Sequence, residues 1–152
     1  MKRILVTAGW IVGSAGFASA CPTWELDGLQ SYEVNGAALY EIVRLEAVAG
    51  GENEMGECNL ANIGAGFVAT QPDVQFEISG LENYSRIEFS VLAECDAVLL
   101  MNDAKKSIRY SDDVNGTDPV IKIDAPANGT YDLWIGTIGP EECAAELFVE
   151  AF

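Results

Sequence analysis

Short strand patterns recur along most of this chain, about ten residues apart, with turn-forming residues between them. Residues 84–92 alternate between apolar and polar side chains, as expected for a strand with one buried face. Residues 97–101 form a continuous apolar run, which is typical of a strand buried on both faces. The other expected strands cover residues 30–34, 38–48, 67–70, 74–79, 107–110, 120–123, 131–135 and 145–152. About nine or ten strands with Gly, Asn and Pro turns predict an all-β chain folded as an antiparallel β-sandwich or barrel.

Two segments of the pattern need a closer reading. Asn35-Gly36 is a strong hairpin dipeptide, so we expect residues 30–34 and 38–48 to form a hairpin. Residues 38–48 are also rich in Glu and Leu, which makes a helix the alternative; Val43 and Val48 favour the strand. Residues 50–66 combine glycines, asparagines and acidic residues and are expected to form a long loop.

The first twenty residues have the pattern of a secretory signal peptide. Lys2 and Arg3 supply the positive start, residues 4–17 are mostly apolar, and residues 18–20 (Ala-Ser-Ala) fit the small-x-small cleavage rule. We therefore expect an exported protein, periplasmic or extracellular, in which residues 21–152 form a single domain. Cleavage would leave Cys21 first, so a lipid-anchored Cys21 is the alternative to a disulfide-bonded one.

Four cysteines follow the signal peptide: Cys21, Cys58, Cys95 and Cys143. An even count in a small exported domain implies two disulfide bonds, with three possible connectivities. We expect Cys21–Cys58, which would tie the N-terminus to the Gly-rich loop. We also expect Cys95–Cys143, which would join the start of the buried strand at residue 97 to the start of the last strand.

Charge and composition exclude several function classes. Acidic residues outnumber basic ones 24 to 8, and after removal of Lys2 and Arg3 the chain carries six basic and 24 acidic residues, a net charge of −18. Nucleic acids and anionic membrane surfaces are therefore poor partners, because both require clustered Lys and Arg. The chain has no histidine, which rules out a Ser-His-Asp or Cys-His catalytic centre.

The acidic cluster within residues 96–118 is the candidate metal site. Calcium takes six to eight oxygen ligands from carboxylates, amides and backbone carbonyls, so weak calcium binding is a hypothesis for this segment. The alternative is a set of turn formers that bind no ion, because Asp, Asn and Gly favour turns by themselves. The candidate ligands are Asp96, Asp112, Asp113, Asn115 and Asp118.

Two other patterns suggest ligands or chemistry. Trp134 shares one strand face with Asp132, so it can face outward as part of a carbohydrate-binding platform or be covered by a loop. Paired carboxylates such as Asp112-Asp113 and Glu141-Glu142 could serve a glycosidase. Adjacent positions on a strand point to opposite faces, however, so neither pair is expected to converge.

The order of elements from Cys95 to Thr137 resembles one known family. An acidic residue leads into an apolar strand, an Asp-rich turn follows, and residues 128–131 (Asn-Gly-Thr-Tyr) open a closing strand. This order resembles the pre-peptidase C-terminal family over residues 71–152, in the small stand-alone form of exported bacterial proteins. The resemblance implies a jelly-roll-like sandwich that serves secreted proteases as a non-catalytic accessory module.

The sequence thus predicts an exported, non-catalytic binding or accessory module with a carbohydrate or protein partner. A carboxylate-based hydrolase and a surface-anchored lipoprotein are the alternatives from other classes. Serine protease activity is not expected, because the chain lacks the imidazole base. The sequence leaves the ligand and the oligomeric state open.

Overall fold

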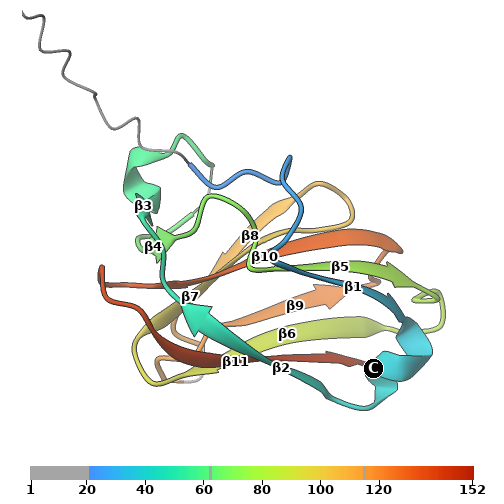
Figure 1. Ribbon diagram of the computed structural model, residues 1–152. Helices are drawn as coiled ribbons and strands as arrows, with labels where there is room; N and C mark the ends of the chain where they lie inside the picture. Colours follow the sequence, from blue (N-terminus) through green and yellow to red (C-terminus); the bar gives the residue numbers. More distant parts are fainter. Residues whose placement is uncertain (1–20, 62, 115) are drawn as a thin grey trace, which may run out of the picture.

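The computed structural model describes residues 21–61, 63–114 and 116–152, and the strands form two β-sheets packed face to face (Figure 1). The expected β-sandwich is thereby confirmed. One sheet contains β1 (Gln30–Asn35), β3 (Asn53–Glu54), β4 (Phe67–Val68), β5 (Val74–Ser79), β7 (Ala97–Asn102), β8 (Ile108–Ser111) and β10 (Gly129–Thr137). The other contains β2 (Val43–Ala49), β6 (Arg86–Ala93), β9 (Val120–Asp124) and β11 (Cys143–Ala151), in the order β2-β11-β6-β9.

Strand β1 contradicts two sequence predictions. It pairs with β5 in parallel, so the sandwich is not antiparallel throughout. Asn35-Gly36 does not form a hairpin either, because the chain passes from β1 through the 3-10 turn η1 (Gly36–Tyr40) into β2 of the opposite sheet. The Asn35 side chain accepts a hydrogen bond from the Ala37 N–H at 3.0 Å, and Leu39 is buried in the core. The Asn side chain therefore starts a crossover between sheets.

The remaining element boundaries lie close to the expected ones. The predicted strand at 38–48 begins only at Val43, because η1 occupies its first residues. The expected loop at 50–66 contains the short strand β3 and a second 3-10 turn, η2 (Met55–Glu57). No helix in the described part of the chain is long and apolar enough to span a membrane.

The main core lies between the two sheets and includes a row of stacked aromatic rings. The Tyr32 and Phe76 ring centroids are 5.6 Å apart, and Phe89 lies 5.5 Å from Tyr131. Phe76 and Phe89 link these two pairs at 6.3 Å, joining strands of opposite sheets. Such offset aromatic contacts add to the burial of apolar area that drives folding.

A second, smaller core lies on the outer face of the seven-stranded sheet. Val98, Leu100 and Trp134 point away from the main core and are covered by Met55 and Val68. These covering residues come from the segment around β3, η2 and β4, which folds over β7 and β10. Strand β7 is consequently buried on both faces, as its continuous apolar run predicted.

Candidate binding face

The outer face of the four-stranded sheet carries the alternate side chains of β2, β11 and β6. Glu46 pairs with Glu146 across β2 and β11, and Glu146 pairs with Leu92 across β11 and β6. Neighbours along the strands, such as Leu147 and Val91, point the other way into the core. The strand alternation of the sequence therefore builds a second, outward row that spans three strands.

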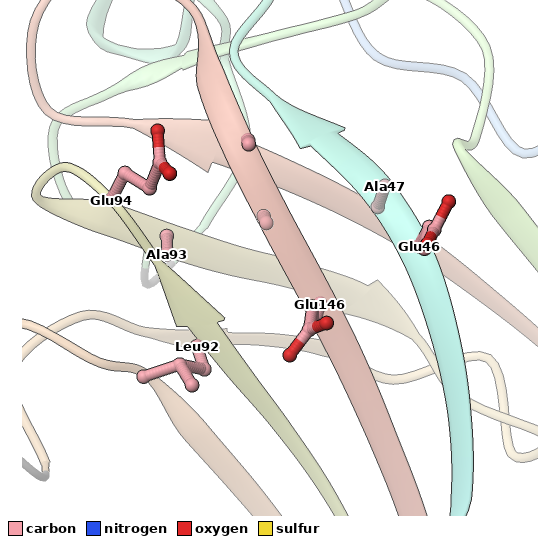
Figure 2. A pocket seen from close by; sticks show the side chains of 8 residues that line it. Glu46, Ala47, Leu92, Ala93, Glu94 and Glu146 are labelled. Carbon is pink, nitrogen blue, oxygen red and sulfur yellow. The ribbon is translucent and has the colours of Figure 1, made fainter.

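This outer face contains an open hollow of about 540 Å³ (Figure 2). Its floor is low because Ala144, the outward residue of β11 opposite Val48, has a small side chain. The Glu94 N–H donates to the Ala144 carbonyl at 3.1 Å and brings the end of β6 to the rim. The hollow is lined by Glu46, Ala47, Leu92, Ala93, Glu94, Ala144, Ala145 and Glu146.

The rim of the hollow is negative and only partly neutralised. Arg44 forms an ion pair with Glu146, and its guanidinium lies 5.9 Å from the centre of the Phe148 ring. Glu46 lies directly opposite Glu146, an arrangement of like charges that destabilises a sheet unless a cation compensates it. Neither Glu46 nor Glu94 forms an ion pair with a described residue.

Exposed apolar side chains accompany these carboxylates. Leu92 is 52% exposed in the middle of the face, and Val48 is 58% exposed at the β2 edge. A second hollow adjoins Leu92 on the β9 side and is lined in part by Val120 and Phe148. The face thus combines apolar contact area with unpaired negative charge.

The carboxylates of the face do not gather into a metal site. Glu46 comes from β2, Glu146 from β11 and Glu94 from the bend just after β6, and the three are spread across the face in Figure 2. Nowhere among the described residues do three acidic or cysteine side chains gather closely enough to hold a metal ion. The arrangement is suited to binding across a surface.

The predicted calcium ligands serve several different parts of the structure. Asp112 accepts a hydrogen bond from the Asp113 N–H at 2.8 Å, and its other carboxylate oxygen lies 3.4 Å from the Tyr110 hydroxyl oxygen. Asp118 accepts from the Ala93 N–H at 3.3 Å and so binds the end of β6. Asn115 lies outside the described residues, so the full ligand set cannot be assembled from them, and the calcium hypothesis stays a prediction.

Tyr110 is the side chain around which this acidic segment is arranged. Its hydroxyl donates to the Ala65 carbonyl at 2.7 Å. Burial raises the pKa of Tyr110 to about 12, and the negative charges of Asp112, Asp113 and Asp96 act in the same direction. Three of the predicted ligands therefore lie near one phenol, although they do not form a group that could hold an ion.

Of the two alternatives for Trp134, an exposed indole or one covered by a loop, the structure shows the covered one. Its side chain is 1% exposed and packs in the second core. The indole N–H is directed to the Thr70 carbonyl at 3.4 Å. The strand pattern correctly placed Trp134 away from the main core, but the segment around β3 and β4 covers that face, which a local pattern cannot reveal.

Both predicted disulfide bonds are confirmed. Cys21 is bonded to Cys58, with Cα atoms 5.7 Å apart, and Cys95 is bonded to Cys143, with Cα atoms 6.1 Å apart. The first bond holds the covering segment beside residue 21. The second joins the turn before β7 to the start of β11, and so connects the two sheets.

Sequence reasoning missed Asp73, at the edge of the sandwich. Its carboxylate accepts from the Ile135 N–H at 2.7 Å, and its own N–H donates to the Leu133 carbonyl at 2.8 Å. The pKa of Asp73 is raised to about 7, mainly by burial; the hydrogen bond from the Ile135 N–H opposes this rise, and the charges of Glu52 and Glu142 contribute to it. A carboxyl with a near-neutral pKa can serve as a general acid. Here the side chain extends the hydrogen bonding between β5 and β10, which is a structural role.

Comparison with known proteins gives only distant similarities. No family model and no curated protein matches the chain. Among solved structures, the pre-peptidase C-terminal domain of a Bacillus anthracis collagenase is 14% identical, with a TM-score of 0.48 over 80% of this chain and 95% of that one. PliG of Aeromonas hydrophila, a periplasmic inhibitor of g-type lysozyme, is 12% identical, with a TM-score of 0.45 over 84% and 100% of the two chains. We take no function from either structure, and the family resemblance stays a resemblance.

Proposed function

We propose that this chain is an exported, non-catalytic module that binds a basic protein surface through the outer face of its four-stranded sheet. One observation carries the proposal: exposed Leu92 shares this face with Glu46 and Glu94, two carboxylates without ion pairs among the described residues. A partner with an apolar patch surrounded by Lys and Arg would cover Leu92 and neutralise the rim.

The charge of the whole domain supports a basic partner. Residues 21–152 carry a net charge of −18, with six basic residues against 24 acidic ones. Such a field accelerates the encounter with cationic proteins and repels nucleic acids and anionic membranes. Charge complementarity at the rim would then determine how the partner is oriented on the face.

The alternatives have less support. A carboxylate-based hydrolase would need a pair of converging carboxyl groups, and in the opposed pair Glu46 and Glu146 the second carboxylate is already bound by Arg44. Carbohydrate binding was argued from an exposed Trp134, which is buried. The bond between Cys21 and Cys58 favours a structural disulfide over a lipid anchor. Disulfides persist in oxidising compartments, which supports export.

The proposal can be tested with cytochrome c as a small basic probe protein. Titration of isotope-labelled domain with cytochrome c should shift the amide NMR signals of β2, β6 and β11 first. Leu92→Lys places a positive charge in the centre of the face and should weaken binding about tenfold, because it repels the basic probe. Leu26→Lys changes the net charge equally at an exposed apolar residue before β1 and serves as the matched control.

Two results would contradict this function. Equal weakening by Leu92→Lys and Leu26→Lys would mean that only net charge attracts the probe. NMR shifts confined to another surface would place binding elsewhere. Moderate salt should weaken specific binding without abolishing it, since apolar contact with Leu92 is not screened.

A further inference from the structure

Strand β2 lies at the edge of the four-stranded sheet, so one row of its backbone groups has no strand partner among the described residues. The Glu94 N–H donates to the Ala144 carbonyl, so the backbone groups of residue 144 on β11 point towards β6. Because backbone groups alternate in direction along a strand, the even-numbered residues of β11 form hydrogen bonds to β6 and the odd-numbered residues form them to β2. The odd-numbered residues of β11 lie opposite odd-numbered residues of β2, so the odd-numbered residues of β2 form the hydrogen bonds to β11. The N–H and C=O groups of Arg44, Glu46 and Val48 consequently point out from the sheet edge.

A side chain from the other sheet confirms this direction. Gln30 on β1 donates from Nε2 to the Glu46 carbonyl at 3.4 Å. Glu46 C=O must therefore point away from β11. This long, solvent-exposed contact occupies one acceptor of the edge and is readily exchanged for a backbone donor.

The outward side chains along this edge are self-complementary. In an antiparallel pairing of two β2 strands centred on Leu45, Arg44 of each copy lies opposite Glu46 of the other. The same register places Ile42, which is 59% exposed just before β2, opposite Val48, which is 58% exposed. These residues are the even-numbered ones whose backbone groups point out from the edge, so once Gln30 releases the Glu46 carbonyl each opposed pair can exchange two N–H···O=C bonds.

We propose that two copies of this chain associate through antiparallel pairing of their β2 edges, which joins the two four-stranded sheets into one continuous eight-stranded sheet. If the pairing were centred on Glu46, the Glu46 side chains of the two copies would face each other. If it were centred on Arg44, the two Arg44 side chains would face each other. Charge therefore selects the register centred on Leu45. The contact is isologous and closes on itself, so it gives a dimer and no fibre.

Two features limit the strength of this dimer. Each copy carries a net charge of −18 over residues 21–152, so the copies repel one another at long range. A single seven-residue edge strand also buries less area than a standard interface. We expect a weak, reversible dimer, and moderate salt should strengthen it by screening the repulsion between the two domains.

Sedimentation velocity of the disulfide-bonded domain, from about 10 μM to about 1 mM, would measure the association. Arg44→Glu should weaken dimerisation about tenfold, because two pairs of glutamates then face each other. Glu46→Arg should weaken it similarly by opposing arginines. The double variant Arg44→Glu/Glu46→Arg restores opposite charges at both pairs and should recover the wild-type association.

Lysine substitutions separate this edge from the binding face. Val48→Lys should abolish dimerisation, whereas Leu92→Lys, at a similarly exposed residue away from the edge, should leave it unchanged. Glu46 and Val48 border both surfaces, but the dimer does not rest on the proposed function, because Leu92 is central to cytochrome c binding and has no part in the paired β2 edges. A chain that stays monomeric over the whole series, or a double charge swap that fails to restore association, would overturn the proposal.

Discussion

Replacing Asp73 by Asn should stabilise the protein at neutral pH. Burial raises the pKa of the Asp73 carboxyl from its ordinary value of 3.8 to about 7 in the folded state. Asn keeps an oxygen that can accept the hydrogen bond from the Ile135 N–H, at 2.7 Å in the wild type. It removes the negative charge that the folded chain must hold beside Glu52 and Glu142.

The sign of the effect follows from proton linkage. Below pH 3.8 the carboxyl is protonated in both the folded and the unfolded chain, so it costs nothing. As the pH rises from 3.8 towards 7, the Asp73 carboxyl ionises in the unfolded chain while it stays protonated in the folded one, so the free energy of unfolding falls. A difference of about 3 pH units corresponds to roughly 4 kcal/mol. Because Asp73 keeps some contact with solvent, this value is an upper limit.

Urea denaturation of wild type and Asp73→Asn at several pH values between 4 and 8 would measure the effect. The variant should be more stable at pH 8 by up to about 4 kcal/mol, and the gain should shrink towards zero at pH 4. Asp27→Asn, at an exposed carboxylate, removes the same charge and controls for net-charge effects. Parallel stability curves for Asp73→Asn and Asp27→Asn would refute the reasoning.

Three other measurements test the structure. Trp134→Ala should lower the free energy of unfolding by about 3–5 kcal/mol, because it empties the second core; a loss below about 1 kcal/mol in urea denaturation would contradict its burial. Cys95→Ser/Cys143→Ser should cost up to roughly 4 kcal/mol for a loop with a sequence separation of 48 residues, seen as a lower Tm. Calcium bound at the acidic segment should raise the Tm more than magnesium at equal ionic strength, and Asp113→Ala should abolish that difference. If calcium and magnesium raise the Tm equally, the acidic segment is a solvated turn that binds no ion specifically.

The local patterns of the sequence predicted most of the strands and the two-layer architecture. Alternating side chains at residues 84–92 and the apolar run at 97–101 depend only on which faces of a strand are buried, and both correspond to observed strands. The disulfide partners were also predictable, because each pair lies at the ends of elements that a sandwich brings together. Strand alternation explains why Glu46, Leu92 and Glu146 point outward, but their alignment in one row depends on the register of β2, β11 and β6.

Other features were decided only by the tertiary structure. Asn35-Gly36 has the same local preference in a hairpin and in a crossover, and the choice depends on β1 pairing with the distant β5. Trp134 faces away from the main core as its pattern predicts, yet residues from η2 and β4 bury it. The raised pKa of Asp73 depends on surroundings supplied by β10 and by charges distant in sequence. Periodicity is encoded over a few residues, whereas strand partners, covering segments and desolvation arise from long-range packing.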